Sequence, residues 1–351
     1  MLNEQDIENL IRENPQVNEG SSVQELVESG KLHLPYGCEV HEGKVTTSIY
    51  GPNLVTRDGI PSRLMYRNRR ISTHDENRGE IPFKDQVLGV NHDLMRGIVR
   101  EYIGTSQFDI EGLEPTSTII AAENLDLIPL ENIMRQHMAV TSTDTSLYQA
   151  WIKAREEGKS EFTYSGQEFR TDSLSPNGRL EELLFSPSTK EGRDRTVSPQ
   201  ELINSRIISQ EQWNRLEKES KSGFKAAEKY LLGRGIVLVD TKTEHGFDRN
   251  RIMKSADELY TMDSSRYWLL DPRTGEVQLD DDGNPKSFSK EFARGLKKGP
   301  DGKFSQEQEI KIAKRYIMGL QHLTREEFKP DLRPRDERII ESTKLILEQL
   351  L

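Results

Sequence analysis

The apolar and polar positions at the start of the chain predict two short helices. An apolar stripe over residues 2–11 ends at Pro15, which cannot continue a helix. Ser22 and Glu25 have the spacing of a capping box, which marks the first turn of a second helix. We therefore expect residues 1–39 to form an N-terminal helical extension.

The pattern changes after this extension. From Val40, short β-type segments lie among turns rich in Gly, Pro and Asn. One helix is expected over residues 87–103. The strongly apolar run 125–134 predicts a buried strand with its lead-in, and the polar stretch 155–197 predicts a long ordered loop or a β excursion.

Helical signals dominate the last part of the chain. Capping boxes that begin at Ser198 and Ser209 open two helices, and apolar residues follow the second at a helical period. The β-branched run 236–239 predicts a buried strand. Two amphipathic helices are expected over 305–320 and 335–351.

Helices and mostly antiparallel strands thus mix without regular βαβ alternation. This mixture favours the α+β class. We expect two lobes, a smaller α+β lobe over 40–123 and a larger one over 124–351 that includes the closing C-terminal helices.

Composition excludes several classes of protein. The chain has 351 residues, a third of them apolar, and a formal net charge of −10, which argues against a nucleic-acid binder with a broad basic face. It has neither an apolar run near ~20 residues nor the features of a signal peptide, so no membrane span is expected. The single cysteine, Cys38, excludes an internal disulfide. These features favour a cytoplasmic protein.

The most informative chemistry lies in the stretch 238–246. If this stretch is a strand, Asp240, Lys242 and Glu244 project to one face at a spacing of roughly 7 Å. The preceding apolar run indicates that this face borders a cleft, where a carboxylate suits Mg²⁺. The alternative is a solvated strand face with cross-strand ion pairs.

A second polar cluster follows at 257–268. Asp257 or Glu258 could supply another metal carboxylate, and Asp263 with Arg266 forms a polar turn before an aromatic pair. Arginine is well suited to hold a phosphate or carboxylate. The alternative is a simple turn with a surface ion pair.

Three weaker signals complete the set. The run 185–190 places hydroxyls and a lysine on a proline-stiffened loop, and a Gly-Lys turn at 43–45 could lay an ammonium over phosphates. Glu131 and Arg135 are charges in an otherwise apolar strand. They hold a substrate or form a structural ion pair.

In their order and spacing, these motifs resemble the family of phosphoribosylaminoimidazole-succinocarboxamide synthase, or SAICAR synthetase. The similarity extends from about Val40 to about Leu320. The runs that carry it are GKV (43–45), IPLENIMR (128–135), FSPSTK (185–190), LVDTKTEHG (238–246), DELYTMDSSRYW (257–268) and SFSKEFARGL (287–296).

The resemblance implies a two-lobed, ATP-grasp-like α+β fold that uses ATP and Mg²⁺. It also implies a reaction in which ATP phosphorylates the carboxylate of carboxyaminoimidazole ribonucleotide and the amine of L-aspartate then displaces phosphate. Small molecules are therefore the expected partners, without nucleic acid or membrane. The oligomeric state is left open between monomer and homodimer.

The resemblance also assigns residues. Glu244 and Asp257 are expected to hold Mg²⁺, and Lys242 to face phosphate oxygens; all three count as catalytic and as ATP-binding. The other ATP-binding residues are Gly43, Lys44, Asp126 and Leu127, the last two in a hinge that holds adenine. The substrate-binding residues are Lys84, Arg135, Thr141, Ser188, Thr189, Lys190, Asp263 and Arg266.

The chain departs from the family pattern at several motif positions, among them Thr46, Phe83, Asp85, Val140, Thr141 and His245. Two other functions are therefore considered. One is a ligase with the same acyl-phosphate mechanism but another carboxylate or amine substrate. The other is a nucleotide-binding relative without turnover.

Overall fold

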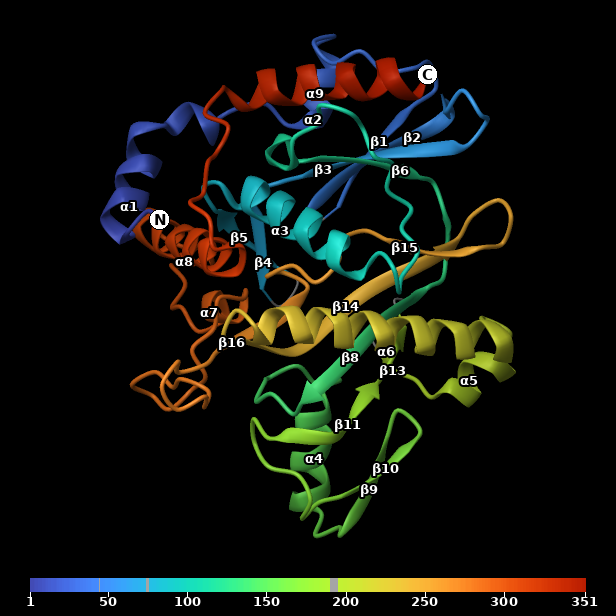
Figure 1. Ribbon diagram of the computed structural model, residues 1–351, viewed down its shortest axis with the longest axis vertical. Coiled ribbons are helices and arrows are strands. Elements are labelled where there is room, and N and C mark those ends of the chain that lie inside the picture. Colours follow the sequence, from blue (N-terminus) through green and yellow to red (C-terminus); the bar gives the residue numbers. More distant parts are fainter. Residues whose placement is uncertain (44, 74–75, 190–194) are drawn as a thin grey trace. The chain divides into compact units, whose positions relative to one another are not determined.

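The protein is described by a computed structural model covering every residue except 44, 74–75 and 190–194 (Figure 1). Its contacts divide it into two compact units. Unit 1 comprises Met1–Leu94, Ser106–Asn124 and Ser287–Leu351, and unit 2 comprises Met95–Thr105 and Leu125–Lys286.

An antiparallel sheet of four strands forms the centre of unit 1. The strand order is β1 (Glu39–Glu42), β2 (Thr46–Val55), β3 (Pro61–Arg67) and β6 (Ile119–Glu123). Side chains alternate between the two faces of such a sheet, so each face has its own apolar set.

One face of this sheet is covered by α2 (Val23–Glu28) and α9 (Arg335–Leu350), whose apolar residues join Tyr66 in a single buried cluster. The Tyr66 hydroxyl also forms a 3.0 Å hydrogen bond with Thr343 Oγ1. Burial of this phenol raises its pKa. The N-terminal extension and the last helix therefore belong to the same core.

The remaining elements of unit 1 surround this core. Helix α1 (Glu4–Glu13) packs against α8 (Gln306–Thr324), where Arg12 pairs with Glu307. The other elements are η1 (Pro15–Val17), the hairpin of β4 (Arg70–Thr73) and β5 (Glu76–Glu80), η2 (Pro115–Ser117) and α7 (Glu291–Arg294). Helix α3 (Lys84–Val99) has residues in both units, those up to Leu94 in unit 1 and those from Met95 in unit 2.

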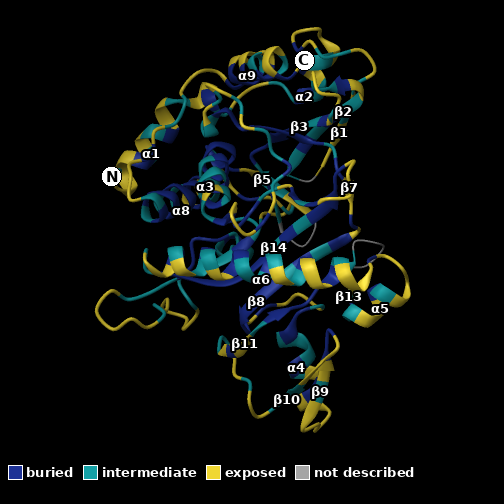
Figure 2. Cartoon of the chain, turned by 45° about the vertical axis from the view of Figure 1, so that its right-hand side comes forward, coloured by how far each residue is buried: buried dark blue, intermediate teal, exposed yellow. Residues whose placement is uncertain are grey.

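Unit 2 is built on an antiparallel sheet around the long strand β14 (Ile236–Phe247), which pairs with β8 (Leu130–His137). Figure 2 shows both strands buried along most of their length. The other strands of the sheet are β7 (Asp126–Leu127), β11 (Arg179–Phe185), β12 (Ser188–Thr189), β13 (Arg195–Thr196), β15 (Met253–Ala256) and β16 (Ser265–Leu269).

Helix α6 (Gln210–Leu232) packs against β14 and β8, and its apolar stripe from Trp213 to Leu231 is buried as predicted. Both predicted capping boxes are present, at Ser198 before α5 (Pro199–Asn204) and at Ser209 before α6. Unit 2 also holds α4 (Leu147–Glu156) and the hairpin of β9 (Glu161–Tyr164) and β10 (Gln167–Arg170).

The α+β class with antiparallel sheets is confirmed. Two details differ from the sequence predictions. Helix α3 begins at Lys84 rather than residue 87, directly after Phe83, which adopts a φ of +59° and is fully buried. The segment from Ser287 groups with unit 1 rather than with the rest of 124–351, because α8 packs on α1 and α9 on the β6 sheet.

The predicted domains 1–39, 40–123 and 124–351 stay a prediction as functional divisions. Among the described residues, no helix combines the length and the apolar character that a membrane span requires.

Candidate active site

Two arginines and one aspartate join three neighbouring strands of unit 2. Asp240 on β14 lies directly opposite Arg135 on β8 and Arg266 on β16. Its Oδ2 accepts from Arg266 Nη1 at 2.6 Å and from Arg135 Nη1 at 3.2 Å. All three side chains are at least 87% buried. The predicted substrate residues Arg135 and Arg266 are thus brought together by Asp240, a carboxylate whose place on this face was expected but to which the family resemblance assigned no role.

Arg135 has a second contact that fixes its guanidinium. Its Nε donates to Ser186 Oγ at 3.1 Å, on the loop before β12. A planar guanidinium held at one edge keeps its other donors in a fixed orientation, which suits recognition of a phosphate or carboxylate.

Lys242 is the centre of a second group on the same strand. Its Nζ lies 2.7 Å from Glu131 Oε1 on β8, and its charge is also close to those of Glu244 and Asp257. Burial alone would lower the pKa of Lys242, but these three carboxylates outweigh that effect and raise it above its ordinary value. The ammonium therefore stays charged at neutral pH.

The register of β14 and β15 explains why Glu244 and Asp257 meet. Glu244 lies opposite Ala256, the last residue of β15, and Asp257 follows at once. Asp257 has a φ of +59°, a left-handed conformation uncommon outside glycine. Its side chain is exposed, whereas that of Glu244 is half-buried. The structure thus brings together Lys242, Glu244 and Asp257, the predicted catalytic set.

The turn that precedes β16 is well ordered by side-chain bonds. Thr261 donates its backbone N–H to Ser264 Oγ at 3.0 Å, and Thr261 Oγ1 accepts from the backbone N–H of Asp263 at 3.2 Å. The carbonyl of Ser264 accepts from the Lys242 N–H at 2.9 Å. These bonds hold the predicted substrate residue Asp263 beside β14, two residues before β16 begins.

The short strand β12 extends the candidate site on the other side of β8. Ser188 lies opposite Glu131, and Thr189 lies opposite Leu130. The Ser188 hydroxyl is buried and has no hydrogen-bond partner among the described residues. Lys190 and Lys44, two predicted ligand residues, lie outside the described residues.

The predicted hinge residues Asp126 and Leu127 form β7, which pairs with the end of β14. Gly246 makes this approach possible, because a Cβ there would lie 2.8 Å from the Asp126 carbonyl oxygen. Asp126 and Leu127 are exposed, and the Asp126 carboxylate pairs with Arg251 at 2.8 Å.

The other predicted residues lie in separate surroundings. Gly43 is exposed in the β1–β2 turn of unit 1, where its N–H donates to the Thr46 carbonyl at 2.8 Å. Lys84 is fully buried at the start of α3 in unit 1. Thr141 follows β8 in unit 2 and is 8% exposed, with its carbonyl accepting from Gln149 Nε2 at 2.6 Å. Their ligand roles stay predictions.

A buried polar pair behind the charged face was not predicted from the sequence. His245 is fully buried, and its Nδ1 lies 2.9 Å from Asn132 Nδ2. Burial lowers the pKa of His245 to about 4, so the ring is neutral at pH 7. Alternation along β14 places it between Glu244 and Gly246 on the face away from Lys242.

The donor set suits a divalent cation that completes its shell with other oxygens. Among the described residues, no group of three or more histidine, cysteine or acidic side chains forms a closed metal site. Mg²⁺ commonly uses one or two protein carboxylates together with phosphate oxygens. Glu244 and Asp257 fit that requirement.

Comparisons with known proteins show the family of the chain. A family model described as SAICAR synthetase matches residues 39–309. The phosphoribosylaminoimidazole-succinocarboxamide synthase of Cytophaga hutchinsonii is 31% identical over 334 residues, covering 90% of this chain and 97% of the relative.

Solved structures show the same fold. The SAICAR synthase from Saccharomyces cerevisiae complexed with SAICAR has a TM-score of 0.63 at 21% identity, covering 85% of this chain and 98% of that chain. A type-2 SAICAR synthetase in complex with ADP has a TM-score of 0.58 at 20% identity, covering 83% and 100%. The match to the family model extends over most of the sequence, including every strand of the charged site. The chain belongs to the SAICAR synthetase family.

Proposed function

We propose that this protein is an ATP-dependent carbon–nitrogen ligase that joins the carboxylate of carboxyaminoimidazole ribonucleotide to the amine of L-aspartate through an acyl phosphate. The observation that carries the proposal is the convergence of Lys242, Glu244 and Asp257 at the junction of β14 and β15. A cation flanked by carboxylates suits the transfer of a phosphoryl group.

Each residue has a distinct task in this proposal. A carboxylate is a poor acyl donor, and phosphorylation gives it a leaving group. Lys242, held charged by Glu131, neutralises the negative charge on the transferred phosphoryl oxygens. Its orientation is fixed before substrate arrives, so little reorganisation is needed during the reaction.

Glu244 and Asp257 would hold Mg²⁺. The cation would neutralise phosphate charge and help to align ATP. The half-buried position of Glu244 and the exposed position of Asp257 suit a metal that keeps some ligands from substrate and water.

Arg135 and Arg266 form the proposed grip for the anionic ribonucleotide. Asp240 holds both guanidiniums in place while their remaining donors serve the ligand. This arrangement positions the substrate carboxylate, and positioning contributes much of the rate in such reactions. The SAICAR-bound and ADP-bound relatives of the same fold support the assignment of substrate classes.

The test is a reconstitution with ATP, Mg²⁺, L-aspartate and carboxyaminoimidazole ribonucleotide, followed by chromatographic detection of the succinocarboxamide product. Product that needs all four components is expected. Absence of product from folded protein would overturn the proposal. Phosphate release with another amine would then indicate a different ligase, and ATP binding without phosphate release a relative lacking turnover.

A further inference from the structure

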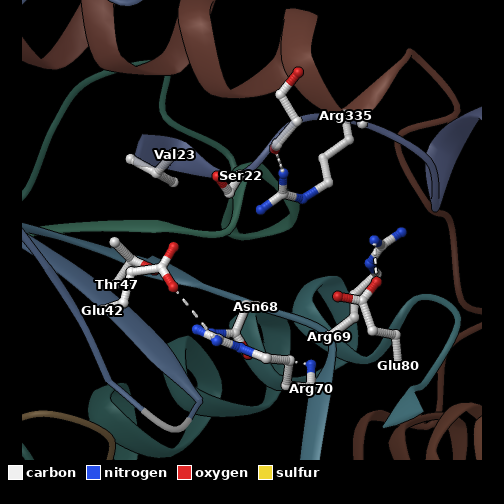
Figure 3. Close-up of a pocket in the computed structure, with 11 residues that line it drawn as sticks. Ser22, Val23, Glu42, Thr47, Asn68, Arg69, Arg70, Glu80 and Arg335 are labelled. Atoms are coloured by element: carbon white, nitrogen blue, oxygen red, sulfur yellow. Dashed lines mark hydrogen bonds and ion pairs between the residues drawn. The ribbon is translucent and has the colours of Figure 1, made fainter. Parts of the chain in front are cut away.

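A polar cavity lies within unit 1, on the side of the sheet that α2 and α9 cover. Its volume is about 280 Å³, close to the lower end of the about 300–1,000 Å³ typical of small-molecule sites. Figure 3 shows Asn68 and Arg69, which follow β3, and Arg70, the first residue of β4, facing it, with Ser22 and Arg335 across from them. Among the described residues, none that is assigned to the candidate active site lines this cavity.

Three guanidiniums reach this space. Arg69 Nη2 lies 2.6 Å from Glu80 Oε2. Arg70 Nη1 lies 3.6 Å from Glu42 Oε2, and its Nη2 donates to the Gly43 carbonyl at 2.9 Å. Arg335 Nη1 donates to the carbonyl of Ser21. An arginine has five N–H donors, so each of these contacts leaves other donors for a ligand.

The charges of the lining are unbalanced. Three arginines face two glutamates, one of which, Glu80, is 55% exposed on its side chain. Arg69 and Arg335 are 6% and 7% exposed. Burial holds the pKa of Arg335 below its ordinary value; the negative charge of Asp85 opposes this effect, and the positive charge of Arg69 adds to it. An anion between them would relieve this repulsion.

Two buried donors of the lining lack partners. Asn68 Nδ2 and Arg69 Nε are both buried without a hydrogen bond to any described residue. The amide of Asn68 is oriented by its oxygen, which accepts from the Arg70 N–H at 3.1 Å. Leaving buried donors unsatisfied costs free energy, so this pair indicates that an acceptor belongs in the cavity.

We propose that this cavity binds a phosphate group, either as inorganic phosphate or as a phosphate monoester. Phosphate oxygens accept several hydrogen bonds at once, and arginine is the side chain that matches them best. The amide of Asn68 and the guanidinium edge of Arg69 supply further donors. A neutral ligand would leave the excess positive charge of the lining, three arginines against two glutamates, without a counter-charge.

The N-terminal extension supplies one wall of this site. Ser21 N–H and Oγ both bond to the Asp336 carboxylate at the start of α9, at 2.8 and 3.1 Å. This contact fixes the segment from Gly20 to Ser22 beside Arg335. The proposal therefore gives the extension a role as part of a ligand site.

The test is calorimetric titration of the full chain in chloride buffer with inorganic phosphate and, separately, with ribose 5-phosphate. Saturable binding of at least one probe is expected. Tighter binding of ribose 5-phosphate would identify a phosphate ester as the occupant, and equal or tighter binding of inorganic phosphate would identify the free ion. Failure of both probes to bind would overturn the proposal.

Variants locate the binding. Asn68→Asp keeps the acceptor oxygen but replaces the free donor with a negative charge, so affinity should fall by about tenfold or more. Arg70→Gln, on a more exposed side chain, should weaken binding in the same way and serves if Asn68→Asp does not fold. Arg170→Gln, on an exposed hairpin, is the matched control and should leave phosphate affinity unchanged. Equal affinity in the cavity variants and wild type would contradict the proposed location.

Discussion

The Oδ2 atom of Asp240 accepts a hydrogen bond from Arg266 at 2.6 Å and also meets Arg135 across the neighbouring strand. The three charges lie in one layer of the sheet because their residues stand opposite one another in the register. One carboxylate thus orients two cations, and its loss affects both.

Asp240→Asn should therefore destabilise the protein strongly. The substitution leaves two largely buried guanidiniums without their carboxylate, and breaking a buried ion pair costs about 3–5 kcal/mol. Urea unfolding at pH 7 measures the change. Asp172→Asn breaks the exposed pair with Arg170 and should leave the free energy of unfolding nearly unchanged. A similar effect of the two substitutions would show that burial does not decide the outcome.

Glu244→Gln should abolish ligation without unfolding the protein. The amide keeps the size of the side chain but removes the charge that the proposed metal site requires, so turnover should fall by at least about a hundredfold. The melting temperature should stay close to that of wild type. Product formation is followed with all four components present. Unchanged turnover in this variant would exclude Glu244 from the metal site.

The buried imidazole of His245 should make stability depend on acid pH. Its pKa is lowered to about 4 by burial, below the ordinary value of about 6.5. The unfolded state therefore binds more protons as pH falls below about 6.5, so this contribution to stability is present above that pH and is lost as pH falls toward 4.

The measurement is the free energy of unfolding at several pH values from 7 to 4 for wild type and His245→Phe. The phenyl ring keeps a flat aromatic side chain at this position and cannot be protonated. We expect the variant to lose less stability than wild type over this window. Parallel pH profiles would show that His245 does not titrate in this range.

Gly246→Ala should weaken the pairing of β7 with β14. A Cβ at this position would lie 2.8 Å from both the Asp126 carbonyl oxygen and the Leu125 Cβ, so the strands must separate. Overpacking of this kind costs about 1–3 kcal/mol. Gly97 lies in α3 with open space around its Cβ position, so Gly97→Ala should instead stabilise by about 0.5–1 kcal/mol. Thermal and urea unfolding show whether each substitution lowers or raises the free energy of unfolding.

Local signals in the sequence predicted many elements well. The capping boxes at Ser198 and Ser209 and the apolar stripe of α6 depend on residues three or four positions apart, so they can be read from a single stretch of chain. The start of α3 was missed by three residues. Phe83 adopts a left-handed conformation that bulky residues rarely take, and buried packing against Phe328 accompanies it.

Part of the candidate active site could also be predicted from a local pattern. Alternation placed Asp240, Lys242 and Glu244 on one face, which the contacts of Lys242 and Asp240 bear out. Their partners depend on strand register over long separations: Arg135 and Asp240 are 105 positions apart. Sequence spacing alone could not show that Glu131 pairs with Lys242.

Unit 1 draws its core from both ends of the chain, and this determines when the core can close during synthesis. Helix α2 precedes the sheet strands, whereas α9, which covers the same face, is made after unit 2. The apolar face around Tyr66 therefore stays partly uncovered while all of unit 2 is being translated. A nascent chain at that stage exposes a surface prone to association with other chains, so its yield in a cell depends on protection until α9 emerges.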